Sequence, residues 1–117
     1  MTLGNLGEDL AEKYLQENGY KIIVRNYKNK IGEIDIIAHD DSFLVFIEVK
    51  TRTSTYQGLP ADAVNYRKQK KIIRVAQWYL QEKKYTGKWR IDVVSILADI
   101  MGISPKIELI KNAVIDV

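Results

Sequence analysis

Residues 32–51 read GEIDIIAHDDSFLVFIEVKT, and this stretch decides the fold. Two runs rich in Ile, Val and Phe flank the polar segment Asp40-Asp41-Ser42. That pattern is typical of a β-hairpin, so we expect strands over Gly32–His39 and Phe43–Thr51. Successive residues of a strand point to opposite faces of the sheet. The register of the pair therefore decides which side chains meet.

One register of this hairpin keeps charge out of the core. Even-numbered residues 34–38 are all apolar, and so are odd-numbered residues 43–49. The two apolar faces coincide only if the turn is centred between Asp41 and Ser42, because a slip of one residue would exchange the faces. The pairs expected from this register are Asp35–Glu48, Ile37–Phe46 and Glu33–Lys50.

The expected register brings two carboxylates together. Opposed Cβ atoms in a sheet are about 4.5–5.5 Å apart, so Asp35 and Glu48 should repel each other. A divalent cation would offset that cost, because Mg²⁺ binds one or two carboxylates together with waters and phosphate oxygens. Lys50 points to the same side and could hold a water or a phosphate oxygen, an arrangement suited to phosphodiester hydrolysis. In the alternative interpretation, Glu48 pairs with Lys50 or another base, and Asp35 is exposed at a strand end.

Working outward from the hairpin, helical and β patterns cover most of the chain. An apolar stripe at helical spacing predicts a first helix over Leu3–Asn18, and Gly4 and Gly7 within that stripe would let another element approach closely. Residues 51–59 are expected to form a loop. The other expected elements are a strand over Tyr20–Tyr27, a helix from Pro60 or Ala61 to Lys84, and strands over Trp89–Leu97 and Lys106–Ile110. This order predicts one domain over residues 1–117, with an α/β sheet flanked by helices.

Composition limits the class of protein. The chain has 117 residues, 46% of them hydrophobic and 28% charged, which fits one globular domain. It has no cysteine, which excludes disulfides and thiolate metal sites. No apolar run reaches the roughly 18 residues of a membrane span, and the N-terminus lacks a signal-peptide pattern. We therefore expect a cytoplasmic protein with no membrane partner.

Charge is unevenly distributed along the chain. Residues 50–90 hold eleven Lys or Arg and two Asp or Glu, whereas the rest holds seven bases and thirteen acids. A basic segment beside an acidic remainder indicates one face for a polyanion. A solvated, lysine-rich helix face would give the same composition, so charge alone leaves both interpretations open.

Several short motifs together resemble a known family. They are Gly4-Asn5-Leu6-Gly7-Glu8 with Ala11 and Tyr14-Leu15; Arg25-Asn26-Tyr27; residues 32–38; residues 45–52; Lys68-Gln69; and Arg90-Ile91-Asp92-Val93-Val94. With these motifs the chain resembles the PD-(D/E)XK nuclease superfamily, and most of all the small bacterial YraN-like proteins related to archaeal Holliday-junction resolvases. The resemblance implies a restriction-endonuclease-like fold, with a mixed sheet of four or five strands and helices on both sides.

The resemblance also implies roles for single residues. Asp35, Glu48 and Glu8 would bind Mg²⁺ or Mn²⁺, with Glu8 acting directly or through water. Lys50 would position or activate the attacking water, and Gln69 would orient a water or a phosphate. The residues expected to contact nucleic acid are Lys50, Thr51, Arg52, Thr53, Lys68 and Lys71.

The chain departs from the superfamily pattern at two positions. Ile34 stands where a proline is common before the aspartate, and Ile73 stands where some nuclease branches have a tyrosine four residues after the glutamine. Two implied roles also have structural alternatives. Asn5-x-x-Glu8 has the spacing of a helix capping box. Gln69 lies within an apolar stripe, where a neighbouring backbone group could satisfy it.

The function expected from these residues is a metal-dependent DNA endonuclease, with branched DNA as a candidate substrate. The alternatives are a non-catalytic nucleic-acid-binding module with a relict nuclease site, or a protein-interaction domain that uses an exposed sheet edge. Two cuts are needed to resolve a four-way junction, which makes a homodimer attractive.

Overall fold

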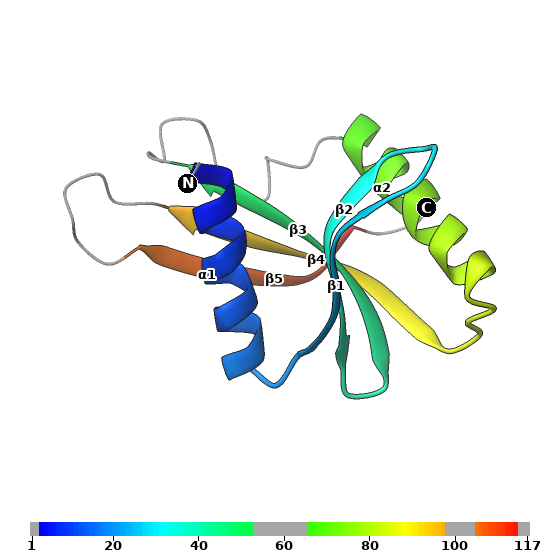
Figure 1. Ribbon diagram of the computed structural model, residues 1–117, viewed down its shortest axis with the longest axis horizontal. Helices are drawn as coiled ribbons and strands as arrows, with labels where there is room; N and C mark the ends of the chain where they lie inside the picture. Colours follow the sequence, from blue (N-terminus) through cyan, green and yellow to red (C-terminus); the bar gives the residue numbers. More distant parts are fainter. Residues whose placement is uncertain (1–2, 53–65, 98–104, 115–117) are drawn as a thin grey trace.

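The computed structural model describes residues 3–52, 66–97 and 105–114, and contains two helices and five strands in these ranges. All strands belong to one sheet with the order β1-β2-β3-β4-β5 (Figure 1). Strands β3 and β4 pair in parallel, while the other neighbours are antiparallel. The elements are α1 (Leu3–Glu17), β1 (Lys21–Lys28), β2 (Glu33–Asp40), β3 (Phe43–Arg52), α2 (Tyr66–Glu82), β4 (Lys88–Leu97) and β5 (Lys106–Val114).

The sheet separates two hydrophobic clusters, each covered by one helix. Ala11 and Leu15 of α1 pack against one face, together with Ile36, Ala38, Val45, Ile47, Val94 and Ile96. The buried side of α2 packs against the other face with Ile37, Leu44, Phe46, Ile91 and Val93. Residues adjacent in sequence, such as Ile36 and Ile37, thus serve opposite faces, as strand geometry requires. The mixed sheet with a helix on either side confirms the expected α/β fold.

The predicted hairpin register is confirmed from the pair Ile36–Ile47 to the turn, whereas the predicted pairs Asp35–Glu48 and Glu33–Lys50 lie beyond the end of the observed β2–β3 ladder. Ile37 pairs with Phe46 and Asp40 with Phe43, as a turn centred between Asp41 and Ser42 requires. Asp41 has a φ of 53°, a left-handed conformation that aspartate tolerates in tight turns.

The face predicted for Ile34 is wrong. Strict alternation would place Ile34 beside Ile36 under α1, but Ile34 packs in the α2 cluster with Ile37. The β2–β3 ladder ends at the pair Ile36–Ile47, and on the other side Asn26 of β1 has a φ of 55°. The regular pleat is therefore interrupted next to Asp35, where the two faces of the sheet exchange.

The remaining differences concern the ends of elements. Strand β5 ends at Val114, four residues beyond the expected Ile110. The added segment contains Asn112, which has a φ of 52°. A shift in the β4–β5 register accommodates this residue. The loop was expected over residues 51–59, but Thr51 and Arg52 belong to β3. The rest of that loop, the first residues of the expected second helix and the expected turn at Met101-Gly102 lie outside the described residues. Among the described helices, none is long and apolar enough to cross a membrane.

Gly7 fixes the approach of α1 to the sheet. A Cβ at this position would overlap the hydroxyl oxygen of Thr51 and lie 3.1 Å from its Cβ. The helix backbone therefore touches β3 directly, which confirms the close approach expected at this glycine. The residue after Gly7 is Glu8, so the same contact sets the position of its backbone beside the end of β3.

Candidate active site

Asp35 lies where the β2–β3 ladder ends. Its Oδ2 accepts a hydrogen bond of 2.8 Å from the backbone N–H of Val49, between Glu48 and Lys50 in the chain. The carboxylate thus replaces a backbone acceptor at the end of the ladder. Burial raises the pKa of Asp35 above its ordinary value, although this hydrogen bond opposes the shift.

The negative charges of Glu48 and Asp35 repel each other. Burial is the main cause that raises the pKa of Glu48 to about 8, and the negative charge of Asp35 raises it further. The opposing effect of the positive charges on Lys50 and Lys68 is smaller. Two carboxylates therefore share a partly buried site that favours a proton, or another positive charge, between them.

A cleft of about 250 Å³ opens beside Glu48 between β3, the start of β2 and α2. We call it the carboxylate cleft. Its lining combines two acids, three lysines and an apolar wall, namely Glu33, Glu48, Lys50, Lys68, Lys71, Ile72 and Val75. Glu48 and Lys50 line the same cleft, as their alternate positions on β3 predict. The structure thus brings together the acid and the lysine expected to act in one site.

Lys68, which was expected to contact nucleic acid, lines the carboxylate cleft together with Glu48 and Lys50. The neighbouring Lys50 is the main cause that lowers the pKa of Lys68, and the negative charge of Glu48 opposes this shift. Lys50 and Lys68 therefore converge beside Glu48. Sequence reasoning missed this convergence because the two lysines are 18 positions apart, and only packing of α2 on the sheet brings them together.

Glu8 approaches the site from α1. Its negative charge contributes to the raised pKa of Asp35. Its Oε1 is buried without a hydrogen-bond donor in the described part of the chain, and the nearest cation is Arg25, with Nη2 at 3.6 Å. Helix α1 begins at Leu3, which makes Asn5 its third residue. The capping-box alternative is therefore wrong, because Asn5 lies inside the helix instead of preceding it.

The oxygen donors fit a hard divalent cation held partly by water. Across residues 3–52, 66–97 and 105–114, no group of three or more His, Asp or Glu is close enough to hold a metal ion by itself. Mg²⁺ commonly uses one or two carboxylates and retains several waters. Asp35 and Glu48 would supply those carboxylates, and the orphaned Oε1 of Glu8 would accept a hydrogen bond from a retained water.

Of the other residues expected in the site, Lys71 lines the carboxylate cleft, and the rest lie elsewhere or are outside the described residues. The Thr51 hydroxyl lies against Gly7, inside the α1–β3 contact. Arg52 ends β3 and is half-buried, Gln69 is half-buried on α2, and Thr53 lies outside the described residues. Lys71 lines the cleft, with its stem over Gly32.

Comparison with known proteins assigns the family. Residues 7–96 match the model of the Uncharacterised protein family UPF0102. The chain belongs to the UPF0102 family. It is 45% identical to a UPF0102 protein of Clostridium botulinum (strain 657 / Type Ba4) over 113 residues, which is 95% of this chain and 92% of the relative. A UPF0102 protein of Clostridium kluyveri is 43% identical over 112 residues, with the same coverage of both chains.

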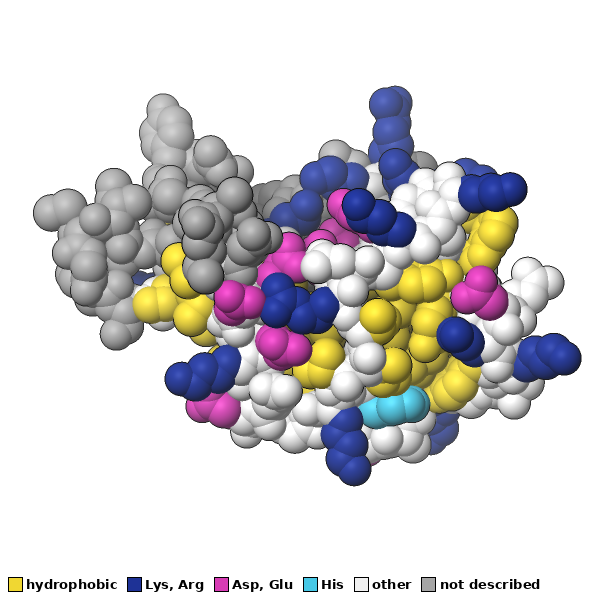
Figure 2. All heavy atoms as spheres, viewed as in Figure 1, with side chains coloured by type: hydrophobic (Ala, Val, Ile, Leu, Met, Phe, Trp, Pro, Cys, Tyr) yellow, Lys and Arg dark blue, Asp and Glu magenta, His cyan; other side chains and the backbone are white. Residues whose placement is uncertain are grey.

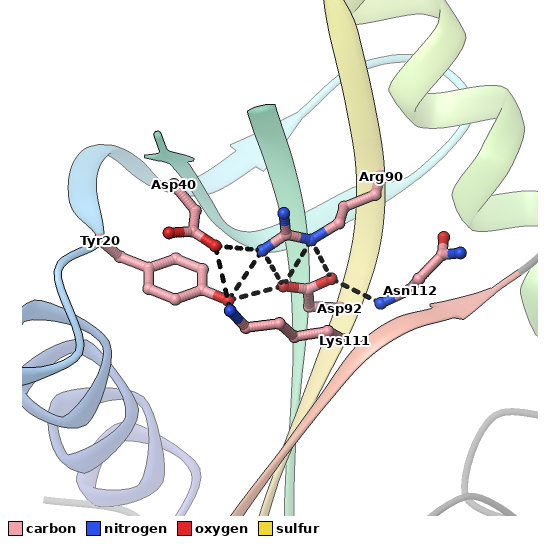
Figure 3. A network of polar contacts seen from close by, with 6 residues as sticks. All are labelled: Tyr20, Asp40, Arg90, Asp92, Lys111 and Asn112. Atoms are coloured by element: carbon pink, nitrogen blue, oxygen red, sulfur yellow. Dashed lines mark hydrogen bonds and ion pairs between the residues drawn. The ribbon is translucent and has the colours of Figure 1, made fainter. Parts of the chain in front are cut away.

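The matched UPF0102 region also contains a polar network on the α1 side of the sheet, away from the carboxylate cleft (Figure 3). Asp92 is fully buried, and its carboxylate binds Arg90 Nε at 3.0 Å and the Tyr20 hydroxyl at 2.9 Å. Arg90 also donates to Asp40 at 2.6 Å. Arg90 and Asp92 are two residues apart on β4, so their side chains share one face of the strand and can pair. The spacing gave no sign of Tyr20 or Asp40, which belong to other elements.

In this UPF0102 chain the network connects Arg90 and Asp92 of β4 to three other parts of the fold. Tyr20 precedes β1, Asp40 ends β2, and the backbone N–H of Asn112 in β5 donates to Asp92 at 2.9 Å. The Arg90 guanidinium holds the pKa of Asp40 below its ordinary value. With each buried charge paired and hydrogen-bonded, the network tolerates burial and has a structural role.

Proposed function

We propose that this protein is a metal-dependent DNA endonuclease of the PD-(D/E)XK type. The observation that carries the proposal is a pair of neighbouring carboxylates beside a lysine. Asp35 binds the backbone N–H of Val49, the residue after Glu48, and Glu48 lines the carboxylate cleft together with Lys50. A structural ion pair would not require a second buried acid beside Glu48. A site for a divalent cation accounts for the second acid, because the cation would neutralise both carboxylates.

The chemistry follows from what each side chain can do. Asp35 and Glu48 would hold Mg²⁺ or Mn²⁺, and this cation would supply Lewis-acid stabilisation of the charge that develops on the phosphate. Lys50 lies two residues after Glu48 and would hold the attacking water or a phosphate oxygen. The water oxygen would form a bond to phosphorus as the water loses a proton, and the bond from phosphorus to one ester oxygen would break as that departing oxygen takes up a proton. Lys68 adds a second positive charge next to Lys50.

The substrate class is part of the same proposal. The resemblance to Holliday-junction resolvases supports branched DNA, and a homodimer would supply the two cuts that a four-way junction needs. The cytoplasm, which holds the DNA of a bacterial cell, is the compartment where this activity would be used. Gln69 on α2 would orient a water or a phosphate, as its position in the family motif implies.

Cleavage of labelled DNA tests the proposal. Branched and linear duplexes are incubated with the wild-type protein in Mg²⁺, Mn²⁺ or EDTA, beside Glu48→Gln and Lys50→Ala. We expect metal-dependent cleavage that falls by at least about 100-fold in both variants, the scale of removing one group that stabilises the transition state. Glu108→Gln and Lys88→Ala are the matched controls, because both residues are exposed on other strands, and should cut like the wild type.

Two outcomes would contradict the endonuclease. Cleavage that survives both Glu48→Gln and Lys50→Ala would place the activity elsewhere. DNA binding with no cutting under any condition would instead favour a non-catalytic binding module with a relict site.

A further inference from the structure

A second hollow adjoins the carboxylate cleft along α2. It measures about 520 Å³ and is lined by Ile31, Arg67, Lys70, Lys71 and Arg74. We call it the basic groove. Lys71 lines both hollows, so the groove and the cleft meet at this side chain. Figure 2 shows Lys and Arg side chains gathered over the upper part of the molecule, where α2 begins.

Helical geometry places the four bases of the groove in one stripe. They recur at intervals of three, one and three residues, which is one side of an α-helix. The opposite side of α2 is buried with Ile72, Val75, Ala76 and Tyr79. From Arg67 to Arg74 the stripe rises about 10 Å, at about 1.5 Å per residue. One strand of duplex DNA carries about three phosphates over that length.

Acids of the fold leave most of the positive charge of the groove unneutralised. Within the described part of the chain, none of the ion pairs includes Arg67, Lys71 or Arg74. Several acids elsewhere are paired with other bases: Arg25 binds acids of α1, and Arg90 binds Asp40. The stripe therefore presents a concentrated positive potential to solvent, which attracts a polyanion.

The opposite wall of the groove is fixed to the same helix. The Asn29 side chain accepts a hydrogen bond of 2.9 Å from the backbone N–H of Ile31 and donates one of 3.4 Å to the carbonyl of Val75 in α2. A Cβ at Gly32 would lie 2.9 Å from Cε of Lys71, so the lysine stem rests directly on this turn. The groove thus has two walls held together, with Lys71 between the groove and the cleft.

From these observations we infer that the basic groove binds the sugar-phosphate backbone of DNA and leads it into the carboxylate cleft. The identity of the polyanion as DNA rests on the proposed function. The contacts are made to phosphates by Arg67, Lys70, Lys71 and Arg74, so they position the strand without reading its sequence. Binding by the groove needs neither Asp35 nor a metal ion.

Fluorescence anisotropy with a labelled DNA duplex in EDTA separates binding from cutting. The test variant is Arg67→Ala/Arg74→Ala, and the matched control Lys13→Ala/Lys83→Ala removes the same charge from exposed positions outside the groove. We expect the affinity of the test variant to fall by at least about tenfold at low salt. Its slope of log K against log salt should shrink by about 2, since each phosphate that the protein neutralises contributes close to 1. The control should keep the wild-type slope.

The result separates the two proposals. Equal binding by the test variant and the wild type would overturn the groove whether or not the protein cuts DNA. The groove would also be overturned if the test variant and the control lost the same DNA affinity, or if the protein bound an RNA duplex tightly and did not bind DNA. If the slope shrinks only in the test variant and no substrate is ever cut, the groove stands and the endonuclease fails.

Discussion

The carboxylate of Asp35 accepts a 2.8 Å hydrogen bond from the backbone N–H of Val49, in the strand that carries Glu48 and Lys50. In this contact Oδ2 of Asp35 holds the ends of β2 and β3 together. The other carboxylate oxygen, Oδ1, would bind the ligand, so the two oxygens of one side chain would have different roles.

Two substitutions at Asp35 distinguish those roles. Asp35→Asn keeps an oxygen acceptor for Val49 but removes the charge, so we expect stability close to wild type and loss of metal-dependent cleavage. Asp35→Ala removes both, and should also lower the free energy of unfolding by about 1–3 kcal/mol. Urea denaturation and a cleavage assay on each variant measure the two effects. Cleavage by Asp35→Asn at the wild-type rate would remove Asp35 from the chemistry.

The stability of the metal-free protein should depend on pH through Glu48. Its folded-state pKa of about 8 lies above the ordinary value of 4.5, so between these values the folded state binds more protons than the unfolded state. Stability contributed by this group is therefore present at low pH and falls as pH rises toward 8. In Glu48→Gln this loss is absent, and we expect a Tm several degrees above wild type at pH 9 and a similar Tm at pH 5.

Thermal melts in EDTA and in excess Mg²⁺ measure this effect. Bound Mg²⁺ should raise the Tm of the wild type and not that of Glu48→Gln, because ligand binding to the folded state stabilises it. Glu33→Gln is the control, since Glu33 is an exposed acid at the same cleft. A wild-type Tm that does not respond to Mg²⁺ at pH 8 would contradict a cation site at Glu48.

The contact between α1 and β3 predicts a non-additive pair of mutations. Gly7→Ala places a methyl group against the Thr51 hydroxyl, so we expect a loss of about 1–3 kcal/mol from overpacking. In Gly7→Ala/Thr51→Ala the hydroxyl is gone, and part of the loss should be recovered. A double-mutant cycle of unfolding free energies measures the coupling, and simple additivity would show that the two residues do not touch.

The buried network predicts a large structural effect without a change in chemistry. Asp92→Asn leaves the Arg90 guanidinium without its buried counter-charge, so we expect a loss of about 3–5 kcal/mol. Asp40→Asn should cost less, because Asp92 still pairs with Arg90 and Asp40 is more exposed. Chemical denaturation compares the variants. If Asp92→Asn lowers the free energy of unfolding less than Asp40→Asn does, Asp92 is not the main counter-charge of Arg90.

By itself, the sequence determined the hairpin and the α/β arrangement. Alternating apolar residues on both sides of the turn left one register that buries no charge, and the pairing of Ile37 with Phe46 confirms it. That register predicted Asp35 opposite Glu48. In the structure the ladder ends one pair earlier, and Asp35 instead binds the backbone N–H of Val49, next to Glu48. The apolar stripe of α1 and its Gly7 predicted a close approach, because these patterns are local and each depends on one element.

Tertiary structure alone decided what comes from distant elements. The convergence of Lys68 on Lys50, the orphaned oxygen of Glu8, and the joining of Tyr20 and Asp40 to Arg90 all depend on how separate elements pack. The break in the pleat beside Asp35 was also hidden, since strict alternation assumes a regular strand and Asn26 interrupts it. Periodicity reports which side of an element is buried. It carries no information on which other element covers that side, and that is decided by the packing of the whole chain.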